Sequence, residues 1–180
     1  LFRSGPVLRS VWRAEKSLPT ILVTITRYCG KKKGGRISVE LREYLMELGM
    51  QGFECSQILM MLALETDGCE NPDLIRAMSG LTGGMGHCQK ECGALTGGCC
   101  VLGYFAGRGS TEEIEHNQFQ KIVQDYVNWF QEEFGTPDGG TDCRSILGHD
   151  FSKTFAVCLP LLEACQEKLT MLLSENGVID

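Results

Sequence analysis

From residue 38 onward, apolar residues recur every three or four positions, and this spacing predicts α-helices. One such segment begins near residue 53, where Cys55, Ile58 and Leu62 would lie on one helical face. The same spacing returns near the C-terminus, at Phe151, Phe155, Cys158, Leu162, Cys165, Leu169 and Leu172. No convincing strand pattern follows residue 36. The sequence therefore predicts an all-α body, built as a bundle of five or six helices.

Local signals predict where several helices begin. Asn71-Pro72-Asp73 combines a capping asparagine, a proline suited to the first helical position and an acid favoured there by the helix dipole. Ser110-Thr111-Glu112-Glu113 has the form of a capping box, which predicts the start of a long helix with an apolar face between Phe119 and Phe130. Pro160 interrupts the C-terminal pattern, so we predict that the last long helix begins only at Leu159.

Residues 1–36 differ from the rest of the chain in charge and pattern. They carry nine Lys and Arg residues against one acid, a formal charge of +8, whereas residues 37–180 carry −14. We therefore predict a basic, irregular N-terminal extension, residues 1–36, with one short strand at 21–25, and a helical cysteine-rich domain, residues 37–180. An acidic domain repels phosphate backbones, so we expect no nucleic-acid partner. No apolar run approaches the roughly 18 residues of a membrane span.

The chain contains ten cysteines, and their number is its most unusual compositional feature. They stand at positions 29, 55, 69, 88, 92, 99, 100, 143, 158 and 165. Their density lies below the roughly 8–10% of disulfide-stapled small proteins, and no segment has the order of a secretory signal. We therefore predict a cytoplasmic protein, whose cysteines serve as metal ligands, reactive thiols or small buried hydrophobes.

Cys92 is the first candidate for a reactive thiol. It follows the glycine-rich segment 80–86 and stands near a predicted helix start, where the dipole and free N–H groups favour a thiolate. Cys88 lies four residues earlier and is a candidate second ligand; if one helix covered both, Cys88, Cys92 and Cys99 would share one stripe. The absence of a C-x-x-C pair disfavours zinc-ribbon and thioredoxin-like sites, and the absence of C-x-x-C-H excludes covalent haem.

Three further cysteines stand at or near predicted helix starts, at positions 55, 143 and 158. We predict that their sulfurs converge with that of Cys92 at one end of the bundle. The cysteines at positions 69, 99, 100 and 165 are explained by apolar neighbours or helix faces, and we expect them to be inert. The small residues between Gly93 and Gly98 predict close helix packing, either within the chain or across a dimer.

These segments resemble the C-GCAxxG-C-C family of redox-active proteins. The matching residues are Gly52-Phe53-Glu54-Cys55-Ser56-Gln57, Gly83-Gly84-Met85-Gly86, Cys92-Gly93-Ala94-Leu95-Thr96-Gly97-Gly98, Asp142-Cys143-Arg144 and Cys158. The resemblance implies a helical domain with four signature cysteines, which here are Cys55, Cys92, Cys143 and Cys158. The domain is also similar to the non-haem part of split-Soret cytochromes c, which implies an iron–sulfur centre and a homodimer, without the haem.

Three functions are consistent with this pattern. The leading hypothesis is an electron-transfer protein or oxidoreductase with an iron–sulfur or related iron centre on the four signature cysteines, with Cys88 as a substitute ligand and a separate redox partner. The second is a metal-free thiol–disulfide protein in which Cys92 is the attacking, catalytic thiolate. The third is a structural zinc site in an interaction module.

Overall fold

The computed structural model describes residues 36–179, and all its elements in that range are helical apart from one isolated β-bridge. The predicted strand at 21–25 and Cys29 lie outside the described residues. The helices are α2 (Arg36–Met50), α3 (Cys55–Asp67), α4 (Pro72–Met78), α5 (Thr82–Met85), α6 (Gly93–Ala106), α7 (Phe119–Phe134), α8 (Cys143–Ile146) and α9 (Thr154–Glu175), with 3-10 turns at Ser79–Leu81 and Phe151–Lys153. The predicted all-α class is confirmed.

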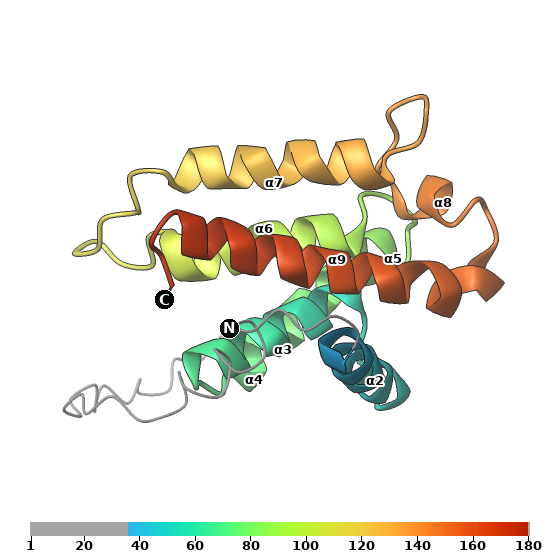
Figure 1. Cartoon of the computed structure of the whole chain (residues 1–180), viewed down its shortest axis with the longest axis horizontal. Helices are drawn as coiled ribbons and strands as arrows, with labels where there is room; N and C mark the ends of the chain where they lie inside the picture. The colour runs from blue at the N-terminus through green and yellow to red at the C-terminus, as the bar shows by residue number, and fades with distance from the viewer. Residues whose placement is uncertain (1–35, 180) are drawn as a thin grey trace, which may run out of the picture.

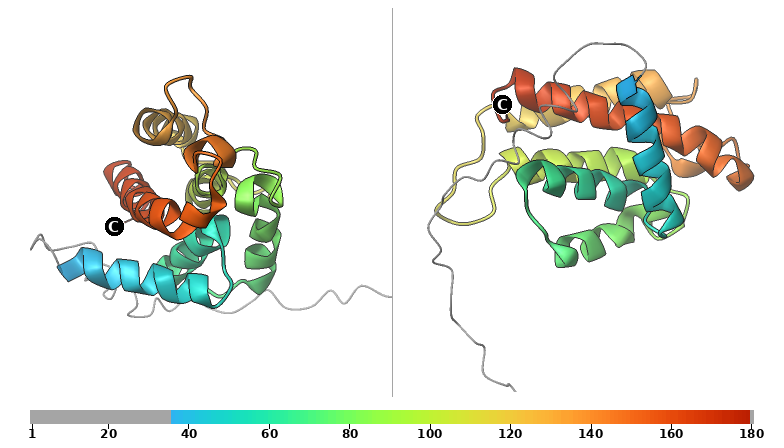
Figure 2. Two further views of the ribbon diagram at one scale, coloured as in Figure 1. Left: turned by 90° about the vertical axis from the view of Figure 1, so that its right-hand side faces the viewer. Right: turned by 60° about the horizontal axis from the view of Figure 1, so that its bottom comes forward.

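The longer helices form a bundle around α6 (Figure 1). Helix α3 packs along one side of α6, while α7 and α9 pack against it and against each other. Helix α2 crosses α9, and the short helices α5 and α8 gather near the start of α9 (Figures 1 and 2). Five helices of 13 to 22 residues with the shorter α4 match the predicted size of the bundle among the described residues.

The helix starts at α3 and α4 follow from local sequence. The backbone N–H of Glu54 donates to Gln57 Oε1 at 3.4 Å, which satisfies a donor at the N-terminus of α3. Asn71 caps α4, because its side-chain oxygen accepts a hydrogen bond from the N–H of Leu74 at 3.0 Å. The prediction from Asn71-Pro72-Asp73 is therefore confirmed.

The predicted helix start at residues 110–113 is wrong. Helix α7 begins only at Phe119, and residues 107–118 form an irregular connection. The carboxylate of Glu113 accepts a hydrogen bond from the N–H of Gly109, and the hydroxyl of Thr111 donates to Glu112. These two carboxylates therefore accept hydrogen bonds within a loop and do not cap the N-terminus of a helix. The apolar face predicted for the helix itself is confirmed, since Ile122, Tyr126 and Phe130 are buried.

The last helix also begins earlier than predicted. Helix α9 starts at Thr154 and contains Pro160 in its interior, so the proline's missing N–H does not end the helix. The first part of its apolar face is not buried, because Phe151 is 45% exposed and Phe155 62% exposed. Burial of this face begins with Leu161 and Leu162. No described helix is long and apolar enough to cross a membrane.

Ser56 forms a buried polar link between α3 and the end of α4. Its hydroxyl donates to the carbonyl of Met78 at 2.9 Å, and the residue has no exposed surface. Ser56→Ala is expected to lower the free energy of unfolding by about 1–2 kcal/mol, because a buried acceptor loses its donor. Ser79→Ala is the matched control, since that hydroxyl donates to the carbonyl of Arg76 at an exposed position. The free energy of unfolding of Ser79→Ala, measured in urea, should stay within about 0.5 kcal/mol of the wild-type value. Equal losses in the two variants would contradict the argument.

Candidate functional site

Three of the four signature cysteines stand at helix N-termini. Cys55 and Cys143 are the first residues of α3 and α8, and Cys92 is the N-cap of α6. Cys158 lies in the second turn of α9. N–H groups in the first turn of a helix have no acceptor inside the helix, so they favour negative charge on a nearby sulfur.

An antiparallel β-bridge between Glu91 and Asp142 brings two of these helix starts together. The N–H of Cys92 donates to the carbonyl of Thr141 at 3.1 Å, and the N–H of Cys143 donates to the carbonyl of Lys90 at 2.7 Å. Segments about fifty residues apart in sequence are thereby fixed side by side, with one signature cysteine on each.

The glycine-rich segment before Cys92 folds around Cys55 and the β-bridge. Gly83 and Gly84 adopt positive φ angles of 59° and 73°, which favour glycine over residues with a Cβ atom. A Cβ atom on Gly84 would lie 2.5 Å from the carbonyl oxygen of Lys90, the acceptor for Cys143. Burial raises the pKa of the Cys55 thiol, and the N–H of Gly83 opposes this shift.

The glycines after Cys92 allow other elements to approach α6 closely. A Cβ atom on Gly93 would lie 2.5 Å from the sulfur of Cys55, and one on Gly97 would lie 2.8 Å from the Cα of Ser56. A Cβ atom on Gly98 would collide with the hydroxyl of Tyr126. The close packing predicted from the small residues therefore occurs within the chain, against α3 and α7.

The thiols of the four signature cysteines influence one another electrostatically. Burial raises the pKa of Cys92, and the thiols of Cys55 and Cys158 raise it further. Burial likewise raises the pKa of Cys158 to about 12, with added contributions from Cys55 and Cys143. For Cys143, burial and then Cys55 raise the pKa. These thiols therefore lie near enough to influence one another, and their convergence in one ligand site stays a prediction.

The N–H groups at the start of α6 only partly offset these effects. Those of Ala94 and Leu95 lower the pKa of Cys92, although neither makes a full cap hydrogen bond to the sulfur. Burial is the larger effect, so the thiol at this helix start is held in its neutral form. The principal influences on the four thiols include no cation.

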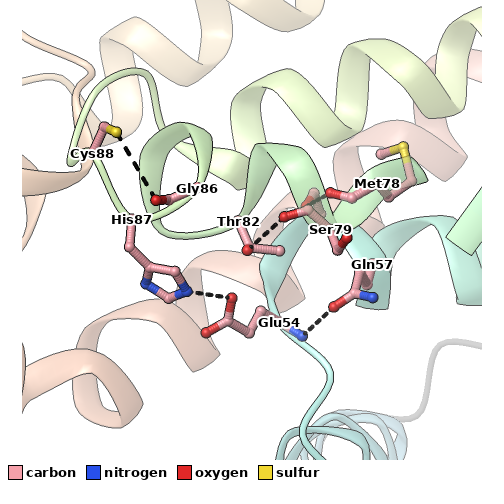
Figure 3. A network of polar contacts seen from close by, with 9 residues as sticks. Glu54, Gln57, Met78, Ser79, Thr82, Gly86, His87 and Cys88 are labelled. Atoms are coloured by element: carbon pink, nitrogen blue, oxygen red, sulfur yellow. Dashed lines mark hydrogen bonds and ion pairs between the residues drawn. The ribbon is translucent and has the colours of Figure 1, made fainter. Parts of the chain in front are cut away.

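Cys88 is not part of this group. Helix α6 begins at Gly93, so Cys88 precedes it and the predicted stripe through Cys88, Cys92 and Cys99 does not form. Cys88 is exposed, and its sulfur lies 3.9 Å from the carbonyl oxygen of Gly86 (Figure 3). The adjacent His87 points toward Glu54, with Nε2 3.2 Å from the carboxylate oxygen (Figure 3).

In the described part of the chain, no three His, Cys, Asp or Glu side chains are placed to hold a metal ion together. Rotation about χ1 moves a cysteine sulfur between staggered positions without moving the backbone. An ion shared by these cysteines would therefore require a change of side-chain conformation.

Cys165 is a fifth thiol beside the group, which the sequence led us to expect only as an inert core residue. Burial raises the pKa of Cys165 to about 12, the hydroxyl of Tyr126 opposes this shift, and the thiol of Cys55 adds to it. The residue has no exposed surface, as expected for a small hydrophobe. Its seven-residue spacing from Cys158 was the available sequence signal, because two turns of helix place both on one face.

The raised pKa of Cys165 predicts a pH dependence of stability for the reduced, metal-free protein. The unfolded chain releases the thiol proton from about pH 9.0, before the folded protein does at about 12. This contribution to the free energy of unfolding is complete below pH 9 and falls by up to about 1.4 kcal/mol per pH unit as pH rises toward 12. Cys165→Ala should show a shallower fall in urea unfolding at pH 9–12, and exposed Cys88→Ala the same fall as wild type. Parallel curves for all three would refute the prediction.

The fold and the site together define an all-α protein whose distinguishing feature is a group of four buried or half-buried thiols. A sequence model described as "Putative redox-active protein (C_GCAxxG_C_C)" matches residues 53–172, two thirds of the chain. The chain belongs to this family. No curated protein and no solved structure matches it significantly.

Proposed function

We propose that this redox-active family member holds an iron–sulfur or related iron centre on its four signature cysteines. The proposal is supported by the place of three of these cysteines at helix starts, by the β-bridge that joins the segments of Cys92 and Cys143, and by the electrostatic influence of the four thiols on one another. Thiolates are preferred ligands of iron–sulfur clusters, and such a centre, when bound, accepts and releases single electrons.

The surrounding residues have separate roles in this proposal. The N–H groups of Gly83 and of Ala94 and Leu95 favour thiolate at Cys55 and Cys92. N–H groups directed at sulfur raise the reduction potential of a thiolate-ligated centre. Burial of Cys92, which is 6% exposed, excludes water from the ligand. The β-bridge at Glu91 and Asp142 holds the backbones of two ligands in register.

Iron and acid-labile sulfide analysis of the anaerobically purified protein tests the proposal. We expect iron and sulfide at stoichiometric levels, with visible absorption that bleaches on reduction. Protein that contains neither, as isolated and after reconstitution, would disprove the iron hypothesis. Stoichiometric zinc without a redox transition would instead establish the structural zinc alternative.

A metal-free thiol–disulfide function is the second candidate, because the sulfurs are not placed to share one ion. In that case two thiols would give two electrons and two protons to a disulfide of a partner protein. The raised pKa of Cys92 weighs against it, since an attacking cysteine needs thiolate character. Alkylation rates against pH would decide this point: the candidate requires one thiol with a pKa below the ordinary value.

We also propose that electrons reach the site from a separate redox partner. The exposed side chains of Phe151 and Phe155 precede Cys158 on the same segment of chain.

The homodimer implied by the resemblance to split-Soret cytochromes c stays a proposal, which sedimentation of the full chain tests.

A further inference from the structure

Residues 83–87 form a left-handed backbone turn shortly before Cys92. All five residues have positive φ angles between 59° and 73°, and Gln89 follows with a φ of 62°. Hydrogen bonds inside the segment close the turn. The N–H groups of Gln89 and Lys90 donate to the carbonyls of Gly83 and Gly84, both at 3.1 Å. The left-handed conformation thus extends over several residues, whereas it ordinarily occurs at single positions.

Three residues of this segment are not glycines. Met85, His87 and Gln89 carry a Cβ atom in the left-handed region, where that atom crowds the backbone. Met85 is 43% exposed and the side chain of His87 is 68% exposed, so burial of these two side chains does little to offset the strain. A strained backbone persists only where contacts with the surrounding structure hold it in place.

Two polar contacts at the protein surface hold the turn against α3 and α8. Nε2 of His87 lies 3.2 Å from the carboxylate of Glu54, the residue directly before Cys55 (Figure 3). Nε of Arg144 on α8 donates a hydrogen bond to Oε1 of Gln89 at 2.7 Å. Water can replace both contacts, because their side chains reach the surface. The turn is therefore strained inside and fastened by contacts that can open.

The sulfur of Cys55 lies beside both ends of the loop that contains the turn. A Cβ atom on Gly93 would lie 2.5 Å from this sulfur and 2.8 Å from the carbonyl oxygen of Leu81. Leu81 directly precedes the loop 82–92, and Gly93 directly follows it. Cys55 is half-buried, and α5 packs against α3, of which Cys55 is the first residue. Movement of this loop would therefore change the exposure of the sulfur.

We propose that residues 82–90 form a latch over Cys55, and that its opening admits thiol-directed reactants to the sulfur. Strain in the left-handed turn favours the open state. The contacts of His87 and Gln89 with α3 and α8 favour the closed state. The latch acts in the reduced, metal-free protein, so its failure and the failure of the proposed iron centre are distinguishable.

The first test compares Met85→Gly with Met85→Ala in the full chain. Both variants lose the methionine side chain, but only glycine removes the Cβ atom from a residue at φ 61°. Amide hydrogen exchange of Gln89 and Lys90 measures opening, because these N–H groups donate to carbonyls inside the turn. Alkylation of Cys55 by iodoacetamide, followed by peptide mass spectrometry, measures access to the sulfur. The exposed thiol of Cys100 is the internal reference.

We expect Met85→Gly to slow the amide exchange and the alkylation of Cys55 by about threefold to fivefold, because glycine removes strain from the closed turn. Met85→Ala should leave both rates within about twofold of the wild-type rates. Equal changes in the two variants, or no change in Met85→Gly, would overturn the proposal. Amide exchange and alkylation that do not change together would overturn it as well, since the turn would then not control access to Cys55.

A second pair of variants tests the contact that favours closure. His87→Ala and His87→Gly both lose the contact with Glu54, and they differ by one Cβ atom at φ 62°. His87→Ala should speed amide exchange and alkylation of Cys55 about twofold to fivefold, the range expected for an exposed contact between such groups. Both rates should be lower in His87→Gly than in His87→Ala. Folded His87→Ala with wild-type rates would contradict the latch.

Discussion

Cys92→Ser is expected to reduce iron binding at least about tenfold and to remove the redox transition of the reconstituted protein. Cys92 is the most buried of the four signature cysteines, and it interacts with the thiols of Cys55 and Cys158. Serine keeps the size of the side chain but replaces a soft sulfur ligand by a hydroxyl that stays protonated. Iron and sulfide content, with electrochemical titration, measure the result.

Cys100→Ser is the matched control for this experiment. Cys100 lies on the same α6 but is exposed, and its thiol is not among the principal influences on the four signature cysteines. Iron content and midpoint potential should therefore equal those of wild type. If Cys92→Ser retains full iron and the control does not, the centre has been assigned to the wrong cysteines.

Gly93→Ala is expected to lower the free energy of unfolding by about 2–3 kcal/mol and to disturb the site at the same time. The added Cβ atom would lie 2.5 Å from the sulfur of Cys55 and 2.8 Å from the carbonyl oxygen of Leu81. The second contact is with backbone, so its strain is relieved only if α6 and Leu81 move apart, while the first contact requires the side chain of Cys55 to move. Urea unfolding gives the change in stability, and iron content reports the change at the site.

Gly103→Ala offers the same substitution, in the same helix, without the collision. No atom outside the local helix lies within 4 Å of a Cβ placed at Gly103. Alanine is favoured over glycine in a helix interior, so this variant should gain about 0.5–1 kcal/mol. We expect the free energy of unfolding to fall in Gly93→Ala and to rise in Gly103→Ala. Equal changes in the two variants would show that the contact with Cys55 is not the reason why glycine is required at position 93.

Much of the fold could be predicted because helical spacing and caps act locally. The periodicity from Cys55 to Leu62 and the signal at Asn71 place α3 and α4 correctly. The start of α7 could not be predicted in the same way. The carboxylates of Glu112 and Glu113 can accept hydrogen bonds in a loop as well as at the N-terminus of a helix. Packing beyond the local sequence decides between these two structures. Pro160 was similarly misleading, since its lost hydrogen bond is tolerated inside α9.

The four signature cysteines could be identified from the sequence pattern, but the electrostatics of their thiols could not be predicted. Position near a helix start indicated a stabilised thiolate at Cys92, whereas burial against other thiols holds it neutral. Burial depends on the approach of α3 and α9, which a single helix start does not reveal. The hydrogen bond from Tyr126 to the carbonyl of Ala94 was hidden for a related reason, because packing alone explains the position of Tyr126 on the apolar face of α7.

The β-bridge between Glu91 and Asp142 also limits when the site can be assembled during synthesis of the chain. Of the four signature cysteines, Cys143 and Cys158 are synthesised last, about fifty residues or more after Cys92. A nascent chain that ends before α8 thus presents two of these thiols without the other two. The full set of four signature cysteines is consequently available only after the start of α9 has been synthesised.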